Sequence, residues 1–225
     1  MKILALVAGT NDPSNAEYLA DRFLEGIRLQ NAMIDVQKIR IRDLHLEHFT
    51  VECYGSSCDP GKDFWRVKDA ILVSDGIVIA SPIWNFSVPA HLKNLLDHLG
   101  MFGLDAETRS KGMLGGKPFF FLFTGGAPVP AWKGLMRFTT MHVPEAIRYF
   151  GGTIVGKDFE GKCMAGKGKF GLVVDKRPET IARIRERGRK FAAFVERWKR
   201  TGKLPLWHRF VTACYLKGQR IMGKL

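Results

Sequence analysis

Short, almost wholly apolar runs separated by amphipathic stretches are the feature that most constrains the fold of this chain. Residues 77–80 (IVIA) and 119–124 (FFFLFT) show no alternation of polar and apolar side chains. Such runs are typical of strands buried on both faces, as in parallel sheets. Because parallel strands need long crossover connections, we expect helices between them.

The stretches between these runs have helical periodicity. Ser14 and Asn15 are good N-caps, and Pro89 fits the first turn of a later helix. Strands are expected at residues 2–8, 33–39, 77–80, 119–124 and 153–155, and helices at 16–27, 62–74, 90–99, before 151 and at 178–200. The inner face of this last helix is expected to consist of Ile181, Ile184, Phe191, Val195 and Trp198.

Five strand–helix units predict an α/β fold. We expect a flavodoxin-like, doubly wound, five-stranded parallel sheet in the order 2-1-3-4-5, with helices on both faces and an extra C-terminal helical segment. Residues 1–201 should form this domain, and residues 202–225 a basic amphipathic extension. The apolar start is interpreted as the first strand rather than as a secretory signal. No segment approaches the about 20 apolar residues of a membrane span.

The net charge of +13 is concentrated near the C-terminal end. The last 50 residues hold fifteen Lys or Arg and three Asp or Glu, so any role in nucleic-acid binding would belong there, and we expect none. The four cysteines, at 53, 58, 163 and 214, form no disulfide framework. They favour reduced thiols and a cytoplasmic location. A reversible Cys53–Cys58 disulfide remains an alternative.

Three loops should lie beyond the carboxyl ends of the strands, where doubly wound sheets bind ligands. Loop 9–15 contains two hydroxyls and the side-chain amide of Asn15, and it leads into a helix. These groups favour the binding of an anion. This loop lacks the nucleoside triphosphate and dinucleotide motifs and suits one terminal phosphate, although Ser14 or Asn15 could serve only as a cap.

The other two loops are 81–89 and 124–130. Pro82 and Pro89 restrict the first of these, so that its N–H groups have fixed directions, and Trp84 can pack against a flat ring. The alternative is that Trp84 only covers the sheet edge. The pair Gly125-Gly126 permits close approach of a ligand, or only a tight turn.

At these residues the chain resembles the flavodoxin-like NAD(P)H-dependent FMN reductase and quinone reductase family. The resemblance covers roughly residues 1–175 and is carried by GTNDPSNAEYLA (9–20), SPIWNFSVPAHLKNLLDHLG (81–100) and GGKPFFFLFTGG (115–126). The second motif is specific, and the other two are weak alone. Its matching positions are Pro82, Trp84, Asn85, Ser87, Pro89, Leu92, Lys93, Asn94, Leu96 and Asp97.

The resemblance implies an enzyme that passes hydride from NADPH or NADH through bound FMN to a quinone, a flavin or a similar small acceptor. It also implies a dimer or tetramer, and neither a protein acid or base nor a metal is expected. The phosphate would be held by Thr10, Ser14, Asn15 and Ala16. The flavin ring would contact Pro82, Ile83, Trp84, Asn85 and Phe86 on one side, and Thr124, Gly125 and Gly126 on the other. The N–H groups of 83–86 would stabilise the reduced ring.

Two departures from the family pattern stand out. Asn11 and Asp12 occupy positions where many relatives have an arginine, and we expect Asp12 to face water. Trp84 replaces the commoner tyrosine.

Other interpretations compete with the flavoenzyme. One is a non-enzymatic FMN electron carrier, and another is a membrane- or anion-binding protein on a flavodoxin-like fold. An iron–sulfur cluster needs four thiolates, and only Cys53 and Cys58 lie in the relevant stretch. His45 and His48 lack partners for a zinc site. His91 and His98 are expected on the solvated face of their helix.

Residues 204–225 form a basic amphipathic pattern. The apolar face would contain Trp207, Phe210, Val211, Cys214, Ile221, Met222 and Leu225, and the charge would come from His208, Arg209, Lys217, Arg220 and Lys224. This pattern fits peripheral contact with the inner face of an anionic membrane. The alternative, which the pattern favours, is that the apolar face packs across a dimer or back on the body.

Overall fold

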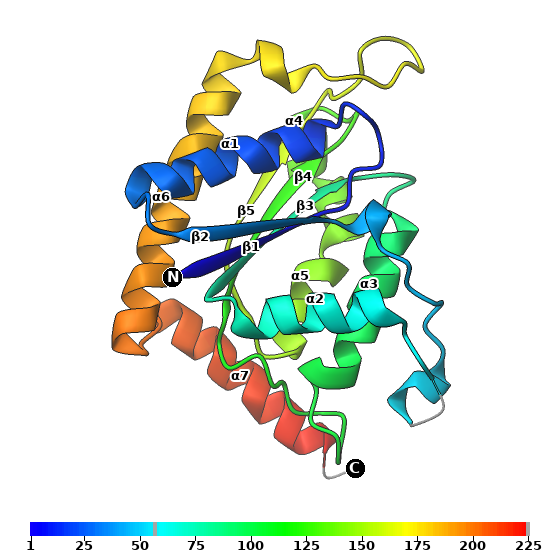
Figure 1. Cartoon of the computed structure of the whole chain (residues 1–225), viewed down its shortest axis with the longest axis vertical. Helices are drawn as coiled ribbons and strands as arrows, with labels where there is room; N and C mark the ends of the chain where they lie inside the picture. Colours follow the sequence, from blue (N-terminus) through cyan, green and yellow to red (C-terminus); the bar gives the residue numbers. More distant parts are fainter. Residues whose placement is uncertain (56–57, 224–225) are drawn as a thin grey trace.

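A five-stranded parallel sheet forms the centre of the computed structural model, which describes residues 1–55 and 58–223 (Figure 1). The strand order is β2-β1-β3-β4-β5, as predicted. The strands are β1 (Lys2–Val7), β2 (Asp35–Arg40), β3 (Gly76–Pro82), β4 (Pro118–Thr124) and β5 (Thr153–Glu160). The predicted α/β class and flavodoxin-like topology are therefore confirmed.

Helices cover both faces of the sheet, and the side chains of β1 alternate between them (Figure 1). Ile3 and Val7 pack under α1 (Asn15–Gln30) and α6 (Pro178–Thr201). Leu4 and Leu6 pack with the helices of the other face. These are α2 (Lys62–Val73), α3 (Ala90–Gly103) and α5 (His142–Tyr149).

Shorter elements connect these layers. They are η1 (Ile41–Asp43), η2 (Val51–Tyr54), α4 (Val129–Lys133), η3 (Leu135–Thr140) and η4 (Val174–Lys176). The last helix is α7 (Leu206–Met222). None of the helices among the described residues is long and apolar enough to cross a bilayer.

Two glycines let α1 and α6 touch backbone to backbone. A Cβ atom on Gly26 would overlap the carbonyl oxygen of Arg185, and one on Gly188 would overlap that of Phe23. The α1–α6 contact therefore depends on both positions having no side chain. Within the expected inner face of α6, Ile184, Phe191 and Val195 are buried, whereas Ile181 and Trp198 are half-buried.

Strand β5 is longer than the expected 153–155. Its second half contains Asp158 and Glu160, which are buried yet charged. Arg183 donates to both carboxylates, at 2.5 Å and 2.6 Å. An apolar pattern did not predict this part of the strand because ion pairs, rather than apolar contacts, satisfy its buried side chains.

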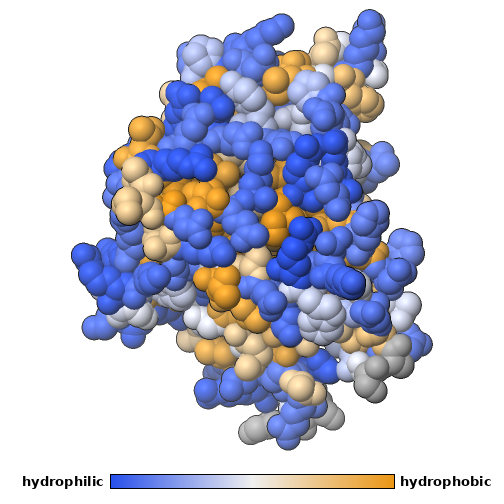
Figure 2. All heavy atoms as spheres, in the orientation of Figure 1, coloured by the Kyte–Doolittle hydropathy of each residue, from blue (hydrophilic) through white to orange (hydrophobic). Residues whose placement is uncertain are grey.

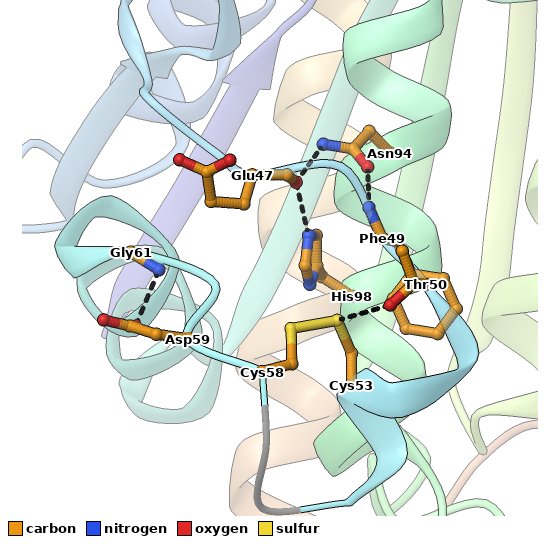
Figure 3. The surroundings of a disulfide bond; sticks show 9 residues. All are labelled: Glu47, Phe49, Thr50, Cys53, Cys58, Asp59, Gly61, Asn94 and His98. Carbon is orange, nitrogen blue, oxygen red and sulfur yellow. Dashed lines mark hydrogen bonds between the residues drawn. A yellow bond between two sulfur atoms is a disulfide. The ribbon is translucent and has the colours of Figure 1, made fainter.

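The connection between β2 and α2 corrects two expectations (Figure 3). Cys53 and Cys58 form a disulfide, so the expectation of reduced thiols is wrong for this pair. His98 is buried rather than solvated, and its Nε2 donates to the carbonyl of Glu47 at 2.8 Å. The reason is that this long connection lies across α3, which helical periodicity does not reveal.

Helix α7 packs on the body through a different face from the one expected. Trp207, Phe210, Ile221 and Met222, all assigned to the packing face, are exposed, and only Val211 is half-buried. The expectation that this apolar face packs back on the body is therefore wrong for these residues. Lys224 and Leu225 lie outside the described residues.

Candidate functional site

A cavity of about 510 Å³ opens where β1, β3 and β4 end. All the predicted cofactor-binding residues except Phe86 line it, so the three loops do come together. Its size lies within the about 300–1,000 Å³ typical of small-molecule sites. The cavity is lined by Gly9, Thr10, Asn11, Ser14, Asn15, Ala16, Pro82, Ile83, Trp84, Asn85, Thr124, Gly125, Gly126, Cys163, Met164 and Phe170.

The first loop turns tightly from β1 into α1. The hydroxyl of Ser14 accepts a hydrogen bond from the backbone N–H of Glu17 at 3.3 Å and so caps the helix. A Cβ atom at Gly9 would overlap the Ser14 hydroxyl, so glycine at this position leaves room for the hydroxyl in its capping position. Ser14 therefore serves as a cap while also lining the cavity, at the positive end of the α1 dipole.

The side chain of Asn15 is fully engaged within the protein. Its Nδ2 donates to the carbonyl of Gly171 at 2.8 Å, and its Oδ1 accepts from the amides of Val173 and Val174 at 2.9 Å and 3.2 Å. The Asn15 amide thus ties α1 to the segment 161–173, which precedes η4. The donors left for an anion at this end of the cavity include the hydroxyls of Thr10 and Ser14 and the first amides of α1.

Arginine reaches the first loop from another part of the chain. Arg42, in η1, donates from Nη1 to the carbonyl of Thr10 at 2.5 Å, and its Nη2 lies 3.5 Å from a carboxylate oxygen of Asp12. Asp12 is exposed, as expected. Because β2 neighbours β1 in the sheet, η1 lies beside the loop, although 32 residues separate Arg42 from Thr10 along the chain. Sequence reasoning missed Arg42, since only this strand pairing brings it there.

His91 supports the same loop from α3. Its Nε2 donates to the carbonyl of Ala8, the residue before Gly9, at 3.0 Å. Burial lowers the pKa of His91 below its ordinary value, which favours the neutral ring. The expected place of His91 on a solvated face is therefore wrong, because the ring packs against the end of β1.

The second loop closes through a two-residue turn. Trp84 and Ser87 exchange backbone hydrogen bonds of 2.8 Å, and Asn85 and Phe86 between them have φ values of 46° and 63°. The amide of Ile83 donates to the carbonyl of Thr124 at 2.7 Å. The N–H groups of Ile83 and Trp84 are thus already occupied, which corrects the expectation that all four amides of 83–86 face a ligand. Within the described residues, no hydrogen bond occupies the amides of Asn85 and Phe86.

The segment between β5 and α6 lines the remaining side of the cavity. It contributes Cys163, Met164 and Phe170. The Cys163 amide donates to the carbonyl of Gly125 at 2.9 Å, and a Cβ atom on Gly126 would lie 3.0 Å from the Met164 sulfur. Sequence reasoning missed these residues, because glycines and lysines surround them and resemble an ordinary surface loop.

The chemistry of the cavity wall is neutral. Among the lining residues there is no Asp, Glu, Lys, Arg or His. The thiol of Cys163 donates to the carbonyl of Glu160, and burial raises its pKa to about 11, so it stays protonated at neutral pH. Such a wall suits a flat, uncharged ring with an anionic tail near α1, and it offers no acid–base pair.

Comparisons with known proteins agree with this geometry. The family model described as NADPH-dependent FMN reductase matches residues 1–143. An FMN-dependent NADH:quinone oxidoreductase of Mycoplasma genitalium is 28% identical, with 57% of this chain and 70% of the relative covered. One of Marinomonas sp. is 24% identical, with 77% of this chain and 98% of the relative covered.

Solved structures also share the fold. The NAD(P)H:quinone oxidoreductase from Methanothermobacter marburgensis has a TM-score of 0.65 and 17% identity, covering 84% of this chain and 96% of that chain. The azoreductase AzrA has a TM-score of 0.61 and 19% identity, covering 86% of this chain and 99% of that chain.

Proposed function

Because the chain belongs to the NADPH-dependent FMN reductase family, we propose that it binds FMN in this cavity. We propose that the protein then uses NADPH or NADH to reduce a quinone. Membership identifies it as an FMN-dependent oxidoreductase that uses a reduced nicotinamide nucleotide. The observation that carries the proposal is the neutral cavity of about 510 Å³ built by all three predicted loops. The curated relatives named as FMN-dependent NADH:quinone oxidoreductases support the choice of acceptor.

The residues present fit FMN. A phosphate would be held by the Thr10 hydroxyl and the first amides of α1, with Ser14 and Ala16 beside it. A ring would lie among Pro82, Ile83, Trp84, Asn85 and Phe86 on one side and Thr124, Gly125 and Gly126 on the other. Asn15 remains among the proposed phosphate-binding residues because it lies beside the cavity, although its side chain is bonded to the 161–173 segment.

The hydride chemistry that FMN supplies when bound is transfer from the reduced nicotinamide to the acceptor. The chain itself orients the ring and excludes water from one face. The amides of Asn85 and Phe86, presented by a fixed turn, are the donors available to an acceptor-rich ring edge. No side chain of the cavity wall is assigned as an acid or base.

We also propose that the protein works as a homodimer. Phe86, with 67% of its surface exposed, and Phe170 stand beside the cavity with little cover from their own chain. A second subunit would shield these aromatic side chains and narrow the access to the ring. Light scattering of the FMN-loaded protein gives the mass directly, and a monomer would contradict this part of the proposal.

The experiment is a three-step assay of the purified full chain. FMN is added and its binding is measured by quenching of flavin fluorescence. Anaerobic stopped-flow mixing with NADPH, and separately with NADH, should then bleach the flavin absorbance. Addition of 1,4-benzoquinone should restore the absorbance with repeated turnover.

Two outcomes would contradict the proposal. If the chain fails to bind FMN, the family cofactor does not use this cavity. If it binds FMN but neither nucleotide bleaches the absorbance, the protein is an electron carrier rather than a reductase. The faster of the two nucleotides identifies the physiological reductant.

A further inference from the structure

The outward face of α7 is apolar and uncovered. Leu206, Trp207, Phe210 and Ile221 have 80%, 69%, 61% and 58% of their surfaces exposed, and Cys214 between them is also exposed. These five residues, which we call the α7 apolar face, recur at helical spacing over the whole helix. In Figure 2 the molecular surface is mainly hydrophilic, with separate apolar areas. Exposed apolar surface arranged in this way marks an interaction site.

The opposite face of α7 explains why the apolar face stays free. Gln219 is only 5% exposed, and its Nε2 donates to the carbonyl of Tyr149 at 2.6 Å. The hydroxyl of Tyr215 donates to Glu145. Polar bonds, together with half-buried Val211 and Leu216, therefore hold the helix on the body, and its large apolar side chains are left for another partner.

The charge of α7 has one sign. The helix contains Arg209, Lys217 and Arg220 and no acidic residue. Lys203 precedes it, and within the described residues none of these four side chains forms an ion pair. A helical projection places Arg209 and Arg220 beside the α7 apolar face, with Lys217 within it. The surface thus combines aromatic and aliphatic side chains with unpaired positive charge.

The combination of apolar side chains and positive charge favours one kind of binding partner for the α7 apolar face. A second copy packed face to face would bring the same positive charges together, which is unfavourable. A nucleic acid would use the charge and leave the aliphatic side chains in water. The interface of an anionic bilayer accepts both, because Trp and Phe enter the headgroup boundary while Lys and Arg bind lipid phosphates.

We propose that α7 lies flat on an anionic membrane and attaches the protein to it peripherally. The helix, about 25 Å long, is parallel to the surface in this arrangement. It packs at the edge of the sheet where β5 begins, beside Gly151–Ile154, whereas the FMN cavity opens at the carboxyl ends of β1, β3 and β4. The attached protein therefore keeps its cavity open to water, and a water-soluble acceptor still reaches it.

The test is flotation of the full, FMN-loaded chain with lipid vesicles. One set contains only phosphatidylcholine, and another contains about one-third phosphatidylglycerol. We expect flotation with the anionic set, loss of flotation in high salt, and little with neutral vesicles. The double variant Trp207→Ser/Phe210→Ser, and separately Arg209→Glu/Arg220→Glu, should lower the bound fraction about tenfold or more.

Matched control variants distinguish membrane binding through the α7 apolar face from non-specific adsorption to vesicles. Leu29→Ser/Met33→Ser removes two equally exposed apolar side chains, and Arg28→Glu/Lys62→Glu changes net charge by the same amount as the arginine pair. Both controls should float like the unchanged protein. All variants must retain their flavin absorbance and far-ultraviolet circular dichroism, which shows that they fold.

Three outcomes would overturn the proposal. The first is absence of flotation with the anionic vesicles. The second is a Trp207→Ser/Phe210→Ser protein that floats normally but loses a dimer seen by light scattering, which would assign the face to a second copy. The third is salt-sensitive binding of a labelled DNA duplex that is lost in the Arg209→Glu/Arg220→Glu variant, while the flotation of this variant stays unchanged.

Discussion

Single residues around the cavity carry conformations and contacts that their types do not normally favour. Phe86 occupies a left-handed position, with φ of 63°, next to Asn85 in the same region. Asparagine tolerates this region, whereas a large aromatic residue does so at a cost. Strain of this kind persists where the surrounding turn over-determines the backbone. Here the turn leaves the amides of Asn85 and Phe86 without a hydrogen-bond partner among the described residues, and Asn85 lines the cavity.

Replacing Phe86 by glycine tests the strain. Phe86→Gly should raise the free energy of unfolding by up to about 1 kcal/mol, since glycine adopts positive φ freely and the lost ring is mostly exposed. Urea denaturation of the FMN-free protein measures this. A control, Phe138→Gly, removes another exposed ring outside such a turn and should not stabilise. A less stable Phe86→Gly protein would mean that the ring contributes packing.

Arg42 acts on the first loop through the carbonyl of Thr10. Arg42→Met keeps the length of the side chain but removes its charge and its hydrogen bond, so FMN should bind roughly tenfold more weakly, about 1.4 kcal/mol. Fluorescence titration measures the Kd, and riboflavin provides the control ligand. Equal weakening for FMN and riboflavin would contradict a role near the phosphate.

At the scale of elements, α1 and α6 pack against each other on one face of the sheet. Their backbones meet at Gly26 and Gly188. Neither helix propensity nor apolar periodicity favours glycine in a helix interior, where it costs about 1 kcal/mol. The two glycines are there because a side chain would hold the helices apart.

The pair Gly188→Ala and Gly218→Ala tests this interpretation. A methyl group at 188 overlaps the carbonyl of Phe23 and should destabilise the protein by roughly 2–4 kcal/mol. Gly218, in α7, has nothing within 4 Å of a new Cβ, so alanine there should stabilise by about 0.5–1 kcal/mol. Thermal melts of both variants show whether each substitution raises or lowers the stability of the protein. Stability at 188 equal to the unchanged protein would show that the helices separate at little cost.

For the whole molecule, three histidines contribute to a common response to acid; His91 and His208 are half-buried, and His142 is more exposed. Burial is the main cause that lowers the pKa of His91, His142 and His208. In the unfolded chain these histidines bind protons at about pH 6.5, whereas in the folded protein they become protonated only at lower pH. The stabilising effect of the neutral rings is therefore complete above about pH 6.5 and is lost as the pH falls toward the folded values.

The midpoint of urea unfolding should accordingly decrease between about pH 7.5 and about pH 5.5. A variant with His91→Gln, His142→Gln and His208→Gln should show a flatter dependence over this range, although its absolute stability will differ. The same slope in both proteins would assign the response to other groups.

Much of this protein was predictable from local pattern. Apolar runs such as 119–124 indicate buried strands, and their alternation with amphipathic helices leads to the 2-1-3-4-5 sheet. The loops 9–15, 81–89 and 124–126 follow from that topology, because the strands before them end at one edge. The sequence by itself thus determined the sheet, the place of the cavity and most of its wall.

Other features depended on contacts between distant segments, and only the tertiary structure decided them. Arg42 reaches Thr10 through strand pairing, His98 is buried under the β2–α2 connection, and segment 161–173 closes the cavity through Asn15. Helix α7 shows the same limit. Its amphipathic pattern was visible in the sequence, but polar bonds from Tyr215 and Gln219 decided that its apolar face points outward. Periodicity identifies an apolar face, whereas the position of every neighbour is needed to tell what covers it.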